Sequence, residues 1–354
     1  RQTEYTGYDD LMTMPLTARE PVEMMETLIG WTAEIAAPAA DGSASQPLAV
    51  DQVLQGQGFY EHPVRFGVHR NLVGVVCLPE GACSGASVLL LTTAYDRHSG
   101  WGGTVVNLAR QLARAGIASM RYDSANIADS PPHPAAPDRV LYNDFQNHDA
   151  IAALDVLESH QPGSLMIAGR CSGGYVAFRT GLVDKRLSAV LAVNPFVFYW
   201  NPLEKVPEDI SVVPRSLEDY GKRFARFETA KRLFTGQVNI KAALRNMVVA
   251  TSRRLSFRIA PLLMHLPGRR TVAREVKRSF THYQQNSIPL TVMYSERDVG
   301  LEHLYFHFGA NGEKLKRYDN VELIMMPETD HNLTPLRARQ RLFEEILKLA
   351  RRTP

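Results

Sequence analysis

Cys171 stands in a short glycine-rich segment that could present a reactive thiol. The segment Leu165–Phe178 reads LMIAGRCSGGYVAF, in which an apolar run predicts a strand and Gly173 opens a stretch typical of a helix. A sharp strand-to-helix turn strains its central residue, and side chains at the flanking positions would crowd the turn. Beside a helix N-terminus a thiol ionises more readily, and backbone N–H groups stabilise an oxyanion. The pattern therefore predicts a nucleophile at the centre of this turn.

Two registers of the turn compete. With Cys171 at the centre, both flanking residues are glycines, Gly169 and Gly173. With Ser172 at the centre, one flanking residue is Arg170, whose side chain is sterically unfavourable there. We therefore favour Cys171 and keep Ser172 as the alternative. A glycine-rich turn around an inert, buried cysteine is the structural alternative to both.

The motif G-x-C-x-G-G of residues 169–174 resembles the cysteine-type nucleophile elbow of the α/β-hydrolase superfamily, including dienelactone hydrolases and polyhydroxyalkanoate synthases. The wider pattern is most similar to bacterial α/β-hydrolases of the serine-aminopeptidase-like group, some of which are associated with exopolysaccharide gene clusters. The resemblance covers roughly Gly58–Ala350. It implies an α/β-hydrolase fold: a mostly parallel central sheet with helices on both faces and an inserted helical cap.

The resemblance also implies an acid and a histidine, which in this superfamily follow the nucleophile in that order. Asp298 comes just after the predicted strand Pro289–Tyr294, with Glu296 as the runner-up. His331 follows the last predicted strand, Val321–Met326. The histidine would accept the thiol proton and later protonate the leaving group, while Asp298 would orient its ring.

The loop that begins at Thr92 departs from the family pattern. The superfamily usually has His-Gly at the start of this loop, where the present chain has Thr92 and Thr93. By the resemblance, the backbone N–H groups of Ala94 and Ser172 form the oxyanion hole that stabilises the tetrahedral intermediate.

Strands and helices alternate along most of the chain, which predicts βαβ units and a mostly parallel sheet. The alternation predicts an α/β core over residues 57–201 and 288–354, interrupted by a helical cap over 202–287. Residues 1–56 differ from the rest and are predicted to be a helical extension with a linker. Their range 21–38 has apolar side chains at helical spacing, so this helix packs on the core or contacts a partner.

The predicted cap is strongly basic. It holds 17 lysines and arginines against 7 aspartates and glutamates, a net charge of +10, whereas the whole chain carries +3. The charge of the whole chain is too small to indicate nucleic-acid binding. A basic entrance could attract an acidic carrier protein, a coenzyme A thioester, an acidic glycan or an anionic membrane. Solvated helix faces are the simpler interpretation.

We predict an esterase, thioesterase or acyltransferase that acts through an acyl-Cys171 intermediate. The alternatives are a non-catalytic binding or scaffold protein of a biosynthetic pathway, for example for polysaccharide, and a serine hydrolase that depends on Ser172. The three cysteines lack CxxC spacing, which argues against a disulfide framework or a zinc site. The same cysteine usage favours a reducing compartment, so a cytoplasmic location is expected. No apolar run is long enough to predict a transmembrane helix. No metal or cofactor is predicted.

Overall fold

The computed structural model of the 354-residue chain describes residues 22–35, 53–94, 96–131, 141–200, 267–296 and 298–352. The chain divides into two compact units. One comprises Arg1–Val50 with Glu208–Val213, and the other comprises Asp51–Pro207 with Pro214–Pro354. Most of the predicted cap, residues 202–266, lies outside the described residues, so the predicted cap and its boundaries stay predictions.

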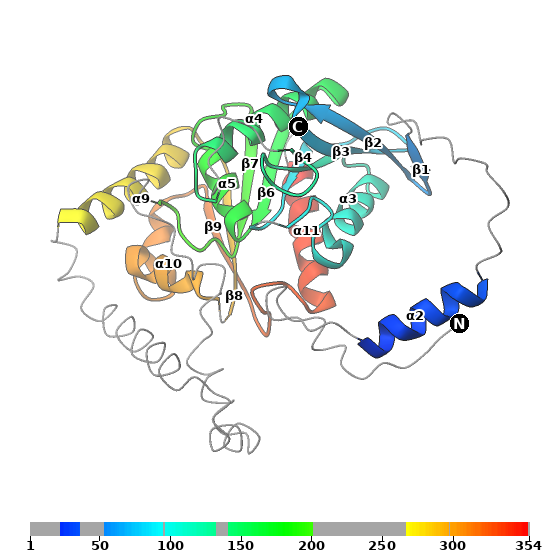
Figure 1. The fold of residues 1–354 in the computed structure, drawn as a ribbon. Helices are drawn as coiled ribbons and strands as arrows, with labels where there is room; N and C mark the ends of the chain where they lie inside the picture. Colours follow the sequence, from blue (N-terminus) through cyan, green and yellow to red (C-terminus); the bar gives the residue numbers. More distant parts are fainter. Residues whose placement is uncertain are drawn as a thin grey trace, which may run out of the picture. The chain divides into compact units, whose positions relative to one another are not determined.

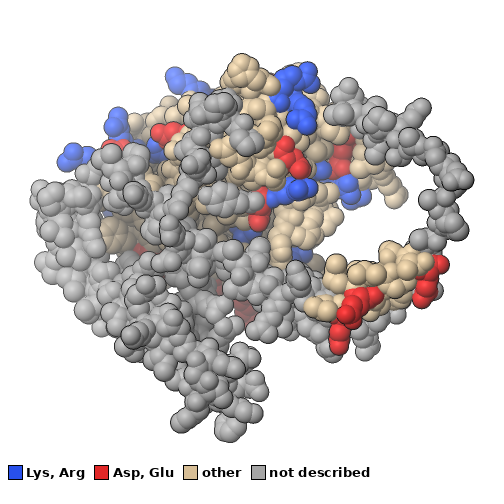
Figure 2. All heavy atoms as spheres, viewed as in Figure 1, with Lys and Arg blue, Asp and Glu red and all other residues tan. Residues whose placement is uncertain are grey.

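The described part of the smaller unit is helix α2, Val22–Ile35, within the range predicted to be helical. Several of its large apolar side chains are exposed, including Met25 and Ile29. Its charged residues are glutamates, with no lysine or arginine among them (Figure 2). The predicted packing of this helix on the core or on a partner stays a prediction.

In the part of the chain that the structure describes, nine strands form one sheet in the order β1-β2-β3-β5-β4-β6-β7-β8-β9 (Figure 1). The strands are β1 (Leu54–Gly56), β2 (Phe59–Phe66), β3 (Leu72–Pro79), β4 (Ser87–Leu91), β5 (Ser119–Asp123), β6 (Leu165–Arg170), β7 (Leu187–Val193), β8 (Leu290–Ser295) and β9 (Val321–Met326). β3 is antiparallel to β2 and to β5, whereas the strands from β5 to β9 are parallel. After the added edge strand β1, this order is that of the α/β-hydrolase fold, which confirms the predicted fold class.

Helices cover both faces of the sheet (Figure 1). The described helices of this unit are α3 (Thr104–Arg114), α4 (Phe145–His160), α5 (Ser172–Thr180), α9 (Pro267–Gln285), α10 (Gly300–Phe308) and α11 (Leu336–Arg352). Short 3-10 segments cover Val68–Arg70, Trp101–Gly103 and Ala310–Arg317. Among the described residues, no helix has both the length and the apolar character needed to cross a bilayer.

Helices α3 and α11 pack together on one face of the sheet. Ala109 and Leu112 of α3 and Ile346 and Leu349 of α11 are almost fully buried in one core cluster. Alternate strand residues such as Met166 complete this cluster, because successive side chains of a strand point to opposite faces. The same alternation leaves the other face of these strands to α4 and α5.

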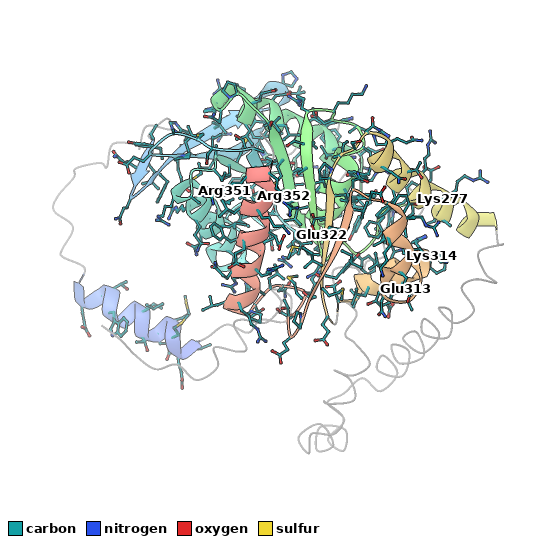
Figure 3. All side chains as sticks on the ribbon, turned by 180° about the vertical axis from the view of Figure 1, so that it is seen from behind. Lys277, Glu313, Lys314, Glu322, Arg351 and Arg352 are labelled. Atoms are coloured by element: carbon teal, nitrogen blue, oxygen red, sulfur yellow. The ribbon has the colours of Figure 1, made fainter. Side chains whose placement is uncertain are left out.

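Charges at the end of α11 favour its position beside β9. The last turn carries Arg351 and Arg352 (Figure 3), and cations at a helix C-terminus interact favourably with the helix dipole. Lys348 donates to Glu345 at 3.0 Å and lies 3.6 Å from Glu322 of β9. These contacts help to place β9, the strand that precedes the predicted catalytic histidine.

Aromatic side chains join α5, α9 and α10. The Phe280 ring of α9 lies 5.3 Å from the Phe178 ring and 4.6 Å from the Phe308 ring, measured between centroids. The Tyr283 hydroxyl donates to the Phe178 carbonyl at 2.7 Å. Helix α9 falls within the range predicted as cap, and its aromatic side chains pack against the helices that cover the sheet.

Candidate active site

Cys171 is the single residue between β6 and α5. Its backbone has φ +56° and ψ −119°, a strained conformation for a residue with a side chain. The strain is held in place because the Cys171 N–H donates to the Val193 carbonyl at 2.8 Å, and its carbonyl accepts the Tyr175 N–H at 3.1 Å. The thiol therefore stands at the N-terminus of α5, above the carboxyl edge of the sheet.

The glycines on either side of Cys171 are required by the tightness of the turn. A Cβ at Gly169 would collide with the backbone of Gly173, and a Cβ at Gly173 would collide with the Thr92 carbonyl. Glycine is therefore sterically required two residues before and two residues after Cys171, the pattern on which the favoured register is based. Arg170, the flank of the competing register, carries its side chain without difficulty.

Ser172, the alternative nucleophile, is 3% exposed. Its hydroxyl oxygen accepts the Ala94 N–H at 2.6 Å. The two residues predicted to supply oxyanion donors are therefore neighbours. In this structure the Ser172 side chain occupies the Ala94 N–H, and it would have to turn away before that group could bind a substrate oxygen.

Asp298 follows β8 and lies at the start of α10. One carboxylate oxygen lies 2.5 Å from His331 Nδ1, and the other accepts the Gly300 N–H at 2.8 Å. The carboxylate is fully buried, and the N-terminus of α10 favours its negative charge. Glu296, the runner-up acid, instead accepts the Glu328 N–H at 3.1 Å.

Cys171 and His331 interact electrostatically, and each shifts the pKa of the other. Burial alone would raise the pKa of Cys171, but His331 first, and then Thr93 and Arg170, lower this pKa to about 7. Burial alone would lower the pKa of His331, but Cys171 and Asp298 raise it to about 10. A thiolate and an imidazolium are therefore favoured together between these values.

The backbone carbonyl of His331 is held by two side chains that the sequence analysis missed. Arg170 donates to it at 3.1 Å and also to Asn332 Oδ1 at 3.0 Å. Asn194, which is completely buried after β7, donates to the same His331 carbonyl at 3.0 Å. Asn194 also bonds Ser295, through its Oδ1 to the N–H at 2.7 Å and its Nδ2 to the Oγ at 3.0 Å. This clamp fixes the histidine loop to the neighbouring strand ends. A polar residue directly after a fully apolar strand was the available signal.

Side chains that could bind a metal occur elsewhere, although none contacts Cys171. Within the described residues one group of three, His98, Asp123 and Asp129, has ligand atoms within 4.8 Å of one another. The Asp123 carboxylate already accepts the N–H groups of His98 and Asp129. The sequence analysis also missed His303 and His307, whose H-x-x-x-H spacing on α10 places their ring centroids 4.5 Å apart. No third ligand joins this pair among the described residues.

No family model and no curated protein matches this chain. Solved structures do resemble it. For an esterase of Pyrococcus furiosus, the identity is 15%, the TM-score is 0.48, and the match covers 83% of this chain and 93% of that one. For a Xanthomonas campestris α/β serine hydrolase without a lid, the identity is 15% and the TM-score is 0.45, with 87% of this chain and 97% of that one covered. For a dienelactone hydrolase of Anabaena variabilis, the identity is 12% and the TM-score is 0.44, with 78% of this chain and 90% of that one covered. These values are too low to transfer an activity or a substrate to this chain.

Proposed function

We propose that the protein is an acyl-transfer enzyme that acts on ester or thioester bonds through a covalent acyl-Cys171 intermediate. Cys171 is the nucleophile, His331 the general base and acid, and Asp298 the residue that orients the imidazole. If water resolves the intermediate, the enzyme is an esterase or thioesterase. If an alcohol or amine does so, it is an acyltransferase.

The first half of the reaction forms the acyl-enzyme. The Cys171 thiolate attacks the acyl carbonyl carbon, and the carbonyl oxygen becomes an oxyanion beside the Ser172 N–H and the Ala94 loop. The intermediate collapses as the bond to the leaving group breaks, and the His331 imidazolium gives its proton to that group. A thioester acyl-enzyme and the free alcohol or thiol remain.

The second half returns the enzyme to its starting state. Neutral His331 takes a proton from water or from an acceptor, and the oxygen or nitrogen so activated attacks the acyl-Cys171 carbonyl. The carbon–sulfur bond breaks, the acid or transferred product leaves, and the thiolate is restored beside the imidazolium. Thiolate is a better leaving group than alkoxide, so it departs without needing a proton from His331.

The observation that carries this proposal is the position of His331, whose ring is bonded to Asp298 and whose charge interacts with Cys171. A thiol is a weak nucleophile until it loses its proton, and this arrangement supports a thiolate near neutral pH. A binding or scaffold protein needs neither the strained cysteine nor the oriented ring.

Intact-mass spectrometry after exposure to a panel of acyl thioesters and activated esters tests the proposal. We expect an acyl adduct on the wild type that is absent in Cys171→Ala and present in Ser172→Ala. An adduct that persists in Cys171→Ala would support a serine hydrolase. Failure of every donor to label the wild type, with the fold intact, would support the scaffold alternative.

We further propose that the natural acyl donor is anionic or is attached to an acidic carrier protein. Support comes from the excess of basic residues in the predicted cap, which includes Lys222, Arg223, Arg253 and Arg254. Reversing these four charges should leave turnover of a small neutral ester unchanged and slow turnover of an anionic coenzyme A thioester at low salt. Equal turnover of the thioester by both proteins would contradict the idea.

A further inference from the structure

A cavity of about 530 Å³ lies on the α3 and α11 side of the sheet. Apolar side chains from α3, from α11 and from the strands beneath them line its walls. They include Leu90, Val105, Leu108, Ala168, Leu342 and Ile346. The volume falls within the roughly 300–1,000 Å³ typical of small-molecule sites.

One end of this cavity is next to the nucleophile turn. Cys171 itself does not line it, but Gly169 and Arg170, the two preceding residues, do. Thr93 also lines the cavity, and it is one of the groups that lower the pKa of the Cys171 thiol. Asn332, the residue after His331, lines the same end. An acyl group on the Cys171 sulfur therefore lies beside the mouth of the cavity.

The chemistry of the lining changes along the cavity. Polar groups of Thr93, Asp96 and Arg170 stand next to the nucleophile turn, and the two helices contribute Leu108 and Leu342 beside Gln111 and Gln340. A charged acyl group would lose hydration against the apolar part of these walls. An alkyl chain would instead leave water for apolar contact.

We propose that this cavity binds the alkyl part of the acyl group, so that medium- and long-chain acyl esters or thioesters are the substrates of Cys171. This inference rests on the proposed acyl-transfer function and names its substrate class. The carbonyl carbon stays at the sulfur, and the chain passes Thr93 and Arg170 to lie between α3 and α11. A buried methylene would then raise kcat/KM by about fourfold, until the cavity is filled.

The first test is a chain-length profile. kcat/KM is measured for acetyl, butanoyl, octanoyl and dodecanoyl thioesters of one small thiol. We expect octanoyl to exceed acetyl in the wild type by at least roughly 10²-fold. Val105→Trp places a large ring in the cavity and should lower the octanoyl-to-acetyl ratio by at least about tenfold. The neighbouring Val106, which does not line the cavity, provides the matched control Val106→Trp, whose ratio should equal that of the wild type.

A second variant works in the opposite direction. Leu342→Ala enlarges the cavity from the α11 side and should move the preferred chain length from octanoyl towards dodecanoyl. If Val105→Trp fails to fold, this shift still decides the question. Chain-length profiles that are the same in wild type, Val105→Trp and Leu342→Ala would overturn the inference.

The third readout needs no catalysis. Trp101 lines the cavity, so a bromine-tagged fatty acid bound there should quench its fluorescence in the Cys171→Ala protein. The additional change Trp101→Phe should remove the quenching. Trp200 does not line the cavity, so Trp200→Phe is the matched control and should keep it. Saturable quenching that persists in Trp101→Phe would contradict the proposed location.

The outcomes separate this inference from the function on which it rests. An acetyl adduct on Cys171, together with flat chain-length profiles and no quenching, would leave the acyl-transfer function standing and refute the cavity assignment. Quenching at Trp101 with no acyl adduct from any donor would refute the acyl-transfer function and leave the cavity as a site for alkyl chains.

Discussion

Two cysteines of this protein lie in different regions and are predicted to behave in opposite ways. Cys77 lies in β3, completely buried near the ion pairs of Glu61 with Arg110 and Arg121. Burial, followed by the Glu61 charge, raises the pKa of Cys77 to about 12 against the lowering effect of three arginines. Its thiol is therefore inert at neutral pH.

Cys171 also lies close to a carboxylate and a cation, but their order differs. Here the imidazole of His331 stands between the thiol and Asp298, so the thiol meets the cation directly. The pKa of Cys171 is lowered to about 7 despite burial. Because Cys77 is fully buried and Cys171 only partly, both the exposure of the thiol and its charged partner distinguish the two residues.

The sharpest way to break this comparison is to remove each thiol in turn. Cys171→Ala should lower turnover of an activated ester by at least roughly 10³-fold, because the covalent intermediate is lost. Cys77→Ala should keep turnover within about twofold and lower the free energy of unfolding by about 1 kcal/mol. Steady-state kinetics and urea unfolding measure the two effects. Comparable losses of turnover in both variants would refute the distinction.

The acid that orients the imidazole offers the next test. Asp298→Asn should reduce kcat by roughly 10³-fold, since the ring loses its charged partner and its preferred tautomer. Glu296 precedes it by two residues and bonds only a backbone N–H among the contacts described, so Glu296→Gln should leave kcat within about twofold. A larger loss of kcat in Glu296→Gln than in Asp298→Asn would show that Glu296, and not Asp298, is the acid.

A buried and a partly buried asparagine test whether the clamp on the histidine loop matters beyond stability. Asn194→Ala removes bonds to Ser295 and to the His331 carbonyl, and should reduce kcat by about tenfold and the free energy of unfolding by about 1–3 kcal/mol. Asn320→Ala also removes two backbone bonds, to Tyr283 and Ile288, and should lower stability alone. An unchanged kcat in Asn194→Ala would give Asn194 a purely structural role.

The sequence predicts the strands well because most of them are short apolar runs separated by helices, and the site residues follow strand ends. The two glycines that flank Cys171 in the sequence are sterically required in the structure, while the choice of Cys171 over Ser172 as nucleophile stays a prediction. The sequence does not reveal Asn194, because its partners Ser295 and His331 lie 101 and 137 residues farther along the chain. Only the folded sheet brings those strand ends together.

The sequence does not predict the state of the Ala94 N–H or the presence of the cavity, for a different reason. The N–H of Ala94 is occupied by the Ser172 hydroxyl, a side-chain rotamer that no pattern encodes. The cavity forms between α3 and α11, and the amphipathic pattern of each helix predicts a packed face but gives no sign of a space left between the two faces.

The central claim is that His331 holds Cys171 as a thiolate near neutral pH, and the rate of alkylation by iodoacetamide as a function of pH tests it most directly. Only the thiolate reacts, so the rate at Cys171, followed by peptide mass spectrometry, should rise with a midpoint near pH 7. His331→Ala should move this midpoint up towards the ordinary thiol value of roughly 8.5, or higher, because only Thr93 and Arg170 then oppose the effect of burial. A wild-type midpoint that already lies at the ordinary value, and that is unchanged in His331→Ala, would contradict the account.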